Sequence, residues 1–182
     1  MDRIGKLNRF ADDNDIGIFY KNIPGIKSFS IPGAVVLDTD LMYHPGKEEV
    51  ALAYGLGSCY YENFYTENDS ALDRRRAHVK NCKFAIRELL PHEVLMEVVE
   101  AGYTNPVEIA GYLNLPVRFV AASCFYDQNG YMMPDYLLDE YPDEVPGDLT
   151  KNKRQQSKNS AGFSHLCDFF IFPFRLETEP SL

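Results

Sequence analysis

The sequence lacks the features that mark secreted, disulfide-bonded and membrane-spanning proteins. It contains only four cysteines in 182 residues, and no two of them are spaced as C-x-x-C. Cysteines this sparse argue against a disulfide scaffold and favour reduced thiols, which fits a cytoplasmic setting. The longest apolar run, at residues 169–172, is far shorter than the ~20 residues that cross a bilayer. The first thirty residues are polar and show no signal-peptide pattern, so we expect an intracellular protein without a membrane span.

Basic residues are also in short supply. Lysine and arginine number 18 against 27 aspartate and glutamate residues, which gives a formal net charge of −9. Such a balance repels nucleic-acid phosphates and favours basic protein partners. The run Arg74-Arg75-Arg76 is therefore interpreted as a solvated helix face rather than a nucleic-acid patch. With 45% hydrophobic residues, the chain can bury a full core, so we expect one domain, or one domain with an appendage.

Hydrophobic periodicity predicts an α+β fold that is mainly helical and has a small β-sheet. Short strands are expected at residues 16–20 and 34–37, the second a β-branched run. Helices are expected at about 47–64, 70–90, 92–101, 105–113 and 116–126. The region before the second strand mixes charge with scattered apolar positions and is broken by turns, so no helix is predicted there.

Two glycines stand inside the predicted helix at 47–64. Gly55 and Gly57 each cost a helix interior roughly 1 kcal/mol relative to alanine. We interpret the pair as a place where another backbone element packs closely against a core helix, in preference to a functional glycine loop.

The last two predicted helices form a helix-turn-helix-like pair at about 104–126. Asn105 is a capping residue, Pro106 suits the first helical position and Glu108 completes a capping box. The second helix offers Arg118 and Ser123 to a base edge, whereas DNA-reading helices carry several Arg, Lys, Asn or Gln side chains. A packing module is therefore favoured over direct DNA binding.

The stretch 127–148 is acidic and aromatic and contains no lysine or arginine. It is either a solvated loop or a surface for a basic groove, because aromatics supply contact area while carboxylates pair with cations. The candidate partner-binding residues are Tyr136, Asp139, Glu140, Tyr141, Asp143 and Glu144. Beyond a polar, flexible linker at 151–160, dense aromatics at 163–174 require cover from the core sheet or from a second subunit.

Residues from about 34 to 131 resemble the ImmA/IrrE metallopeptidase family of phages and mobile elements, whose members act on repressor proteins. The resemblance lies in the order and spacing of the motifs Val36-Leu37-Asp38, Leu52-Ala53-x-x-Leu56-Gly57, Phe84-Ala85, Leu89-Leu90-Pro91 and Val107-Glu108-Ile109-Ala110-x-x-Leu113. It implies a zincin-like core. It also implies a degenerate ImmA-like domain at 1–131, followed by the acidic loop, linker and aromatic C-terminal segment at 132–182.

Family members hold zinc with two histidines four residues apart on one helix and a glutamate on the next, with a second glutamate as general base. By this resemblance the degenerate zinc-site positions are Tyr54, Gly55, Ser58 and His78. Tyrosine and serine oxygens stay protonated at neutral pH, and glycine carries no proton acceptor. We therefore expect no bound metal, no cofactor and no catalytic residue, and we interpret His78 as an ordinary surface or capping histidine.

In length, acidic balance and degraded peptidase core, the whole chain also resembles phage anti-CRISPR proteins of the type II-A class. This resemblance implies a non-enzymatic homodimer in the host cytoplasm that binds an RNA-guided Cas nuclease and blocks productive DNA binding or cleavage. An acidic protein is steered towards the positively charged channel of such a nuclease. The alternative is a protease-dead antirepressor or a helix-turn-helix transcriptional regulator of a mobile element.

Overall fold

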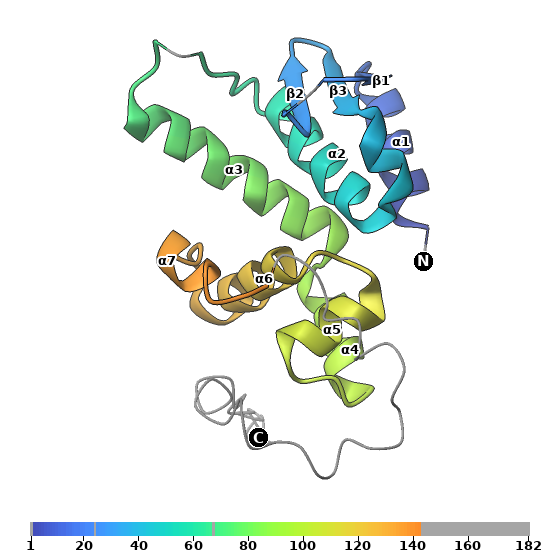
Figure 1. Ribbon diagram of the computed structural model, residues 1–182, viewed down its shortest axis with the longest axis vertical. Helices are drawn as coiled ribbons and strands as arrows, with labels where there is room; N and C mark the ends of the chain where they lie inside the picture. Colours follow the sequence, from blue (N-terminus) through green and yellow to red (C-terminus); the bar gives the residue numbers. More distant parts are fainter. Residues whose placement is uncertain (1, 24, 67, 143–182) are drawn as a thin grey trace, which may run out of the picture. The chain divides into compact units, whose positions relative to one another are not determined.

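The computed structural model describes residues 2–23, 25–66 and 68–142, which belong to one compact unit, Met1–Pro146. The fold of this unit is α+β, as predicted, with a small sheet beside a larger set of helices (Figure 1). In chain order the elements are α1 (Arg3–Asp13), β1 (Gly17–Lys21), β2 (Ser28–Ile31), β3 (Ala34–Asp38), the 3-10 helix η1 (Thr39–Tyr43), α2 (Pro45–Tyr60), α3 (Ala71–Leu89), α4 (His92–Glu100), α5 (Pro106–Leu113), α6 (Val117–Asn129) and α7 (Asp135–Leu138). None of these helices has the length and apolar character needed to span a bilayer.

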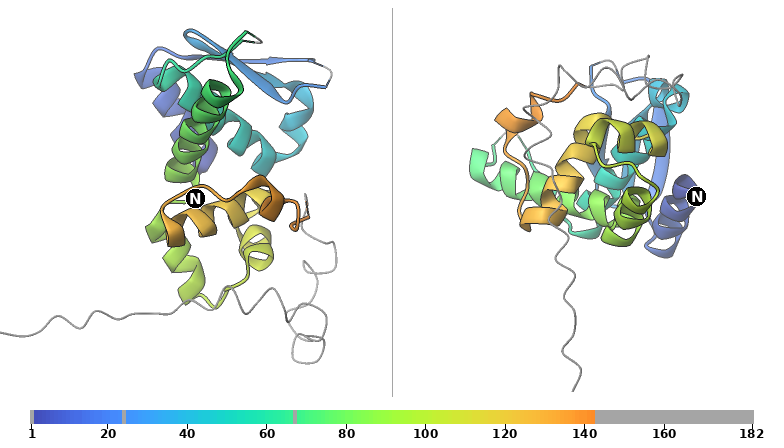
Figure 2. Two further views of the ribbon diagram at one scale, coloured as in Figure 1. Left: turned by 90° about the vertical axis from the view of Figure 1, so that its left-hand side faces the viewer. Right: turned by 90° about the horizontal axis from the view of Figure 1, so that it is seen from below.

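The sheet has the strand order β1-β3-β2, with β3 parallel to β1 and antiparallel to β2. All five residues of β3 are buried, as expected for the central strand of a sheet. Helices α1 and α2 contact the strands and lie on one side of the sheet (Figure 2). On that side, the Ser30 hydroxyl donates a hydrogen bond to the carbonyl of Gly55 over 3.2 Å, which joins β2 to α2.

Two clusters of buried apolar side chains hold the unit together. The sheet-side core is built from α1, the strands, α2 and α3, and its fully covered members include Leu7, Leu56 and Phe84. The helical core is built from α4, α5, α6 and the end of α3. Val50 and Phe119 pack against both clusters, so the two cores are continuous.

The predicted helix pair is present as α5 and α6. The Asn105 side chain accepts a hydrogen bond from the Val107 N–H over 2.8 Å, which confirms the predicted cap. Asn114 ends α5 with a φ of 54°, a left-handed conformation that asparagine tolerates. The inner faces of both helices are buried in the helical core, and α6 continues to Asn129. The structured chain then continues past residue 131 with α7.

The beginning of the chain differs from the sequence expectation, because it forms helix α1. The Asp2 side chain caps α1 by accepting from the Gly5 N–H over 2.9 Å, and Leu7 and Ala11 are buried one turn apart. Strand β2 was also not predicted. Helix α2 ends at Tyr60 rather than at residue 64, and Tyr60 and Tyr61 are exposed instead of belonging to its buried face. The acidic stretch is not a single loop, since its first three residues complete α6 and residues 135–138 form α7.

Candidate functional site

Three of the degenerate zinc-site positions, Tyr54, Ser58 and His78, lie where α2 packs against α3. The hydroxyl oxygen of Tyr54 on α2 is 2.9 Å from Nδ1 of His78 on α3. One turn along α2, the Ser58 hydroxyl accepts a hydrogen bond from Nδ2 of Asn81 over 2.5 Å. On its other side, the His78 ring presents Nε2 to the sulfur of Cys82 at 3.4 Å. We call these five residues the α2–α3 polar cluster.

The local sequence of α3 brings the cluster together. Ser70 caps α3 by accepting from the Asp73 N–H over 3.1 Å, as the capping pattern predicts. Starting there, the helical period turns Asn81 and Phe84 towards α2 and leaves His78 at the margin of the contact. Gly57 permits the close approach, since a Cβ at this position would lie 3.0 Å from Cβ of Phe84 and 3.3 Å from Cα of Asn81.

Gly55, at the position of the general base, faces the sheet instead of α3. A Cβ at this position would lie 2.5 Å from Cγ1 of Val35 and 3.1 Å from the hydroxyl oxygen of Ser30. Real Cβ atoms do not approach a neighbour so closely, so any side chain here requires Val35 to move. The predicted close approach of another backbone is confirmed at Gly57, where Cα of Asn81 on α3 is near; at Gly55 the near atoms belong to the side chains of Val35 and Ser30.

Burial controls the ionisation of the cluster. Desolvation raises the pKa of the Tyr54 phenol, with smaller contributions from Tyr65 and Cys82. Desolvation, together with the charge of Asp135, raises the pKa of the Cys82 thiol to about 11. The His78 side chain is exposed, yet partial desolvation lowers its pKa; the charge of Asp135 opposes this shift and the charge of Arg75 adds to it. Near neutral pH the phenol and the thiol are therefore protonated and the imidazole is neutral.

Two arrangements of protons fit these ionisation states. Either the Tyr54 hydroxyl donates to Nδ1 of His78 and the Nε2–H of the ring is directed at the Cys82 sulfur, or Nδ1–H donates to the Tyr54 oxygen and the Cys82 thiol donates to Nε2. A phenol with a raised pKa is a weak nucleophile, and so is a protonated thiol. The arrangement is a chain of neutral hydrogen bonds that holds two helices together, and it contains no activated group.

A zinc ion of the kind that members of the resembled family hold does not fit this cluster. At the three ligand positions, Tyr54 and Ser58 offer protonated oxygens, and Nδ1 of His78 is already hydrogen-bonded to the Tyr54 hydroxyl. Within the described ranges, no group of three or more His, Cys, Asp or Glu side chains could hold a metal ion. The base position is closed by Val35, so no proton acceptor replaces the missing glutamate.

Of the candidate partner-binding residues, Asp139, Glu140 and Tyr141 directly follow α7. Arg118 Nη1 is 3.7 Å from an Asp139 carboxylate oxygen, and Arg118 Nε donates to the carbonyl of Tyr141 over 3.1 Å. Tyr141 packs against the helical core, while Glu140 is exposed. Tyr136 belongs to α7, but its side chain is not described, and residues Asp143 and Glu144 lie outside the described residues.

Sequence reasoning did not identify Asn81 and Cys82 as members of the cluster. Asn81 is fully buried, and its Oδ1 has no hydrogen-bond partner among the described residues. The available signal was its position: Asn81 follows His78 by three residues and Cys82 follows it by four, so all three share a side of α3.

No family model matches this chain, and no curated protein is similar to it in sequence.

Proposed function

We propose that this chain is a protease-dead, zincin-like protein that acts by binding another macromolecule. Its proposed target is a type II RNA-guided Cas nuclease, whose productive DNA binding or cleavage it blocks. The proposal that the chain is not a protease rests on the hydrogen bonding within the α2–α3 polar cluster. Tyr54 and His78 are bonded to each other where relatives of the resembled family hold zinc, and Val35 fills the space of the general base.

Charge supports a basic protein as the target. The chain carries a net charge of −9, and the nuclease holds its RNA–DNA heteroduplex in a positively charged channel. Attraction between oppositely charged surfaces accelerates the association of two proteins, and added salt weakens this attraction. An acidic surface that occupies the channel would compete with nucleic acid for it.

The part of the acidic stretch that the structure describes is anchored to α6. Arg118 contacts both the Asp139 carboxylate and the Tyr141 carbonyl. Asp139 and Tyr141 are therefore tied to α6, a helix whose inner face is buried. A surface held in place before binding loses less conformational freedom on binding. Asp139 and Glu140 are exposed and are proposed as contacts for arginine or lysine side chains of the nuclease.

Capture by the guide-loaded nuclease tests the proposal. The purified full-length chain should bind the immobilised nuclease at low salt, with affinity falling as salt rises. Asp139→Lys/Glu140→Lys should bind at least ~10-fold more weakly, equivalent to about 1.4 kcal/mol. A matched control, Glu97→Lys/Glu100→Lys, makes the same charge change at two exposed positions of α4 and should bind as the wild type does. Absence of a complex at low salt would refute the proposed target.

The direct DNA-binding alternative receives no support from α6. Arg118 is the one cation in the α6 sequence, and it is engaged by Asp139 and by the Tyr141 carbonyl.

Following the resemblance to anti-CRISPR proteins, we propose that the active form is a homodimer. A dimer would present two acidic surfaces to the nuclease.

A further inference from the structure

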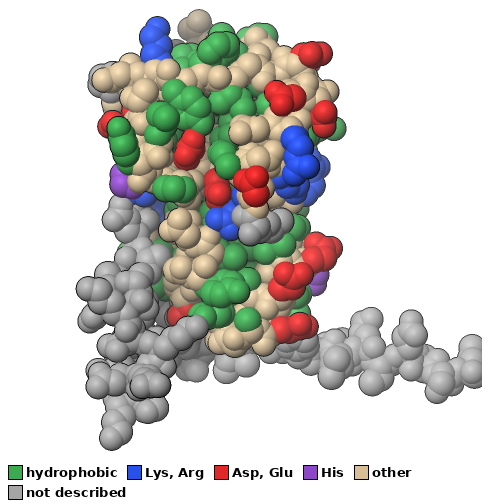
Figure 3. All heavy atoms as spheres, turned by 90° about the vertical axis from the view of Figure 1, so that its right-hand side faces the viewer, with side chains coloured by type: hydrophobic (Ala, Val, Ile, Leu, Met, Phe, Trp, Pro, Cys, Tyr) green, Lys and Arg blue, Asp and Glu red, His purple; other side chains and the backbone are tan. Residues whose placement is uncertain are grey.

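Helix α3 concentrates positive charge on an otherwise acidic chain. Six of the 18 lysines and arginines lie in its 19 residues, together with one aspartate and one glutamate. In the rest of the chain, acidic residues outnumber basic ones by more than two to one. On the side of the unit away from the start of α3, Lys and Arg side chains are interspersed with Asp and Glu side chains (Figure 3). The excess of positive charge is therefore local to α3.

Four of these cations form a line along the outer side of α3. They are spaced by four, three and four residues, which places them on one face of the helix: Arg76, Lys80, Lys83 and Arg87. We call these four residues the α3 basic stripe, which is about 16 Å long at a helical rise of about 1.5 Å per residue. Of the run Arg74-Arg75-Arg76, only the last residue belongs to the stripe, because successive residues point in different directions around a helix.

The two end residues of the stripe have carboxylate neighbours on α3 itself. Arg76 Nη1 lies 3.4 Å from an Asp73 oxygen, and Arg87 Nε lies 3.1 Å from a Glu88 oxygen. Both arginine side chains are more than half exposed, and exposed ion pairs contribute little to stability because water and salt screen them. The Glu88 carboxylate also pairs with Lys6 over 3.2 Å. A phosphate can therefore become the partner of either guanidinium group at little cost.

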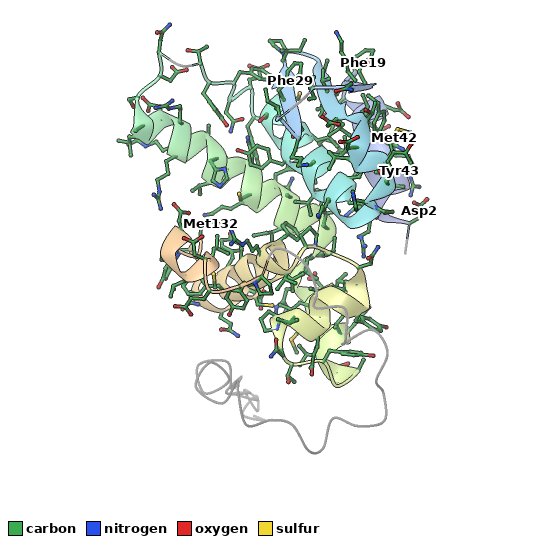
Figure 4. All side chains as sticks on the ribbon, viewed as in Figure 1. Asp2, Phe19, Phe29, Met42, Tyr43 and Met132 are labelled. Atoms are coloured by element: carbon green, nitrogen blue, oxygen red, sulfur yellow. The ribbon has the colours of Figure 1, made fainter. Side chains whose placement is uncertain are left out.

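The two lysines in the middle of the stripe have no carboxylate partner within the described ranges. Helix α6 and the connection that carries Met132 lie below α3 in Figure 4, and on this side the Lys83 ammonium is 5.1 Å from the centre of the Tyr126 ring. This contact orients Lys83 without neutralising its charge. Lys80 is exposed. The middle of the stripe thus carries two uncompensated positive charges.

The shape of the stripe fits a strand of phosphates. Neighbouring residues of the stripe lie about 5–6 Å apart, close to the distance between successive phosphates of a nucleic-acid strand. Lysine and arginine contact phosphates without regard to base sequence. The one asparagine of α3, Asn81, is fully buried, and α3 contains no glutamine, so its exposed side offers no amide to read a base edge. The residues of the stripe therefore indicate contact with a phosphate backbone.

We infer that the α3 basic stripe binds the phosphate backbone of RNA, and that the guide RNA of the nuclease is the RNA it meets. Before it engages DNA, a guide-loaded nuclease offers two kinds of surface, basic protein and RNA phosphate. The acidic residues after α7 suit the first surface, and the stripe suits the second. The identity of the RNA rests on the function proposed above, whereas phosphate binding by the stripe does not depend on it.

The net charge of −9 weakens this contact but does not prevent it near physiological salt. The Debye length is about 8 Å at 0.15 M ionic strength, which is half the length of the stripe. A phosphate on the stripe therefore interacts mainly with the stripe, because more distant carboxylates are screened. Repulsion by the whole chain grows at lower salt, so about 0.1–0.3 M salt is the range in which the stripe can be tested.

Fluorescence anisotropy of the full-length chain with a short labelled oligouridine tests phosphate binding. The wild type should bind, and Arg76→Gln/Lys80→Gln should bind ~10-fold more weakly or worse at about 0.1 M salt. Each phosphate contact on a single strand contributes about 0.7 to the slope of log affinity against log salt, so the slope should fall by about 1.4 in this variant. Glutamine keeps the helix propensity of the replaced residues, and circular dichroism should show an unchanged helix content.

A matched control makes the same charge change away from α3. Lys21→Gln/Lys27→Gln replaces two exposed lysines at the end of β1 and before β2, and it should bind oligouridine as the wild type does. A wild-type chain that does not bind oligouridine would overturn the inference, and so would an affinity that rises with salt. Equal affinities of the wild type and Arg76→Gln/Lys80→Gln would overturn it as well.

Capture by the nuclease with and without its guide identifies the source of the phosphates. Arg76→Gln/Lys80→Gln should weaken capture by the guide-loaded nuclease ~10-fold and leave the affinity for the guide-free protein at the wild-type level. An equal loss with and without the guide would mean that the stripe meets an acidic protein surface, which would overturn the inference. Unchanged capture of a variant that has lost oligouridine binding would exclude the guide RNA as the source. If neither form of the nuclease captures the chain, the proposed target fails, while the oligouridine result still decides phosphate binding.

Discussion

The Tyr54 hydroxyl on α2 and Nδ1 of His78 on α3 are 2.9 Å apart, so two positions that would be zinc ligands in the resembled family are hydrogen-bonded to each other. The two rings are also in contact, with centroids 5.5 Å apart. The pair is a direct link between α2 and α3. The link predicts a stabilising role for the pair.

Removing the Tyr54 hydroxyl should destabilise the fold without disrupting it. Tyr54→Phe keeps the ring and deletes the hydrogen bond to His78, which typically contributes about 1 kcal/mol. Urea unfolding of Tyr54→Phe, His78→Ala and the double variant would measure the coupling between the two side chains, expected at about 0.5–1.5 kcal/mol. Strictly additive effects would show that the two groups do not interact.

Stability should fall as the solution is acidified through the range where histidine titrates. Desolvation lowers the pKa of His78 in the folded state below its ordinary value of 6.5, so the unfolded chain binds the proton more readily. The contribution of the neutral ring is therefore complete above pH 6.5 and is lost as the pH falls towards the folded-state pKa. His78→Gln should show a smaller decrease in urea midpoint between pH 7.5 and 5.5 than the wild type. An equal decrease in both proteins would assign the acid sensitivity to other groups.

A methyl group at Gly55 should destabilise the chain even though alanine favours helices. The new Cβ would lie 2.5 Å from Cγ1 of Val35, and overpacking of this kind costs about 1–3 kcal/mol, against a gain of about 1 kcal/mol in helix propensity. Val35→Ala opens a cavity by itself, but combined with Gly55→Ala it should cost less than the sum of the single changes. Additive costs in thermal or urea unfolding would mean that the two side chains do not compete for space.

Arg118 should hold the residues after α7 in place. Arg118→Gln removes its ion pair with Asp139 and weakens the contact with the Tyr141 carbonyl. Hydrogen exchange at the amides of residues 139–141 should therefore become faster. Arg76→Gln is the control, because it also removes an exposed ion pair, with Asp73, at the start of α3. Unchanged exchange in Arg118→Gln would show that the helical core alone fixes this segment.

The sequence predicted those elements whose ends carry local signals. Ser70 and Asn105 cap α3 and α5 as expected, and the β-branched run became the central strand. Helix α1 was missed because its apolar positions are few, although the Asp2 cap and the spacing of Leu7 and Ala11 were present. Strand β2 has only four residues, and its pairing with β3 depends on partners that are distant in the sequence.

The candidate site was predictable only in part, for a related reason. Its positions on α2 followed from a resemblance of short motifs, but the partners on α3 depend on how the helices pack. His78 was interpreted as a surface or capping histidine, and its side chain is exposed; the bond that its ring forms between the helices was not predicted. The filling of the base position by Val35 was not visible in the sequence either, because β3 and α2 meet only in the folded chain.

The zinc content of the full-length protein, measured after dialysis against a chelator and then against metal-free buffer, tests the central claim most directly. We predict that the wild type retains no stoichiometric zinc and takes none up on titration. Tyr54→His, which would add an imidazole beside His78 and Cys82, should gain measurable zinc affinity and serves as the positive control. A wild-type chain that keeps about one zinc ion per molecule would contradict the account.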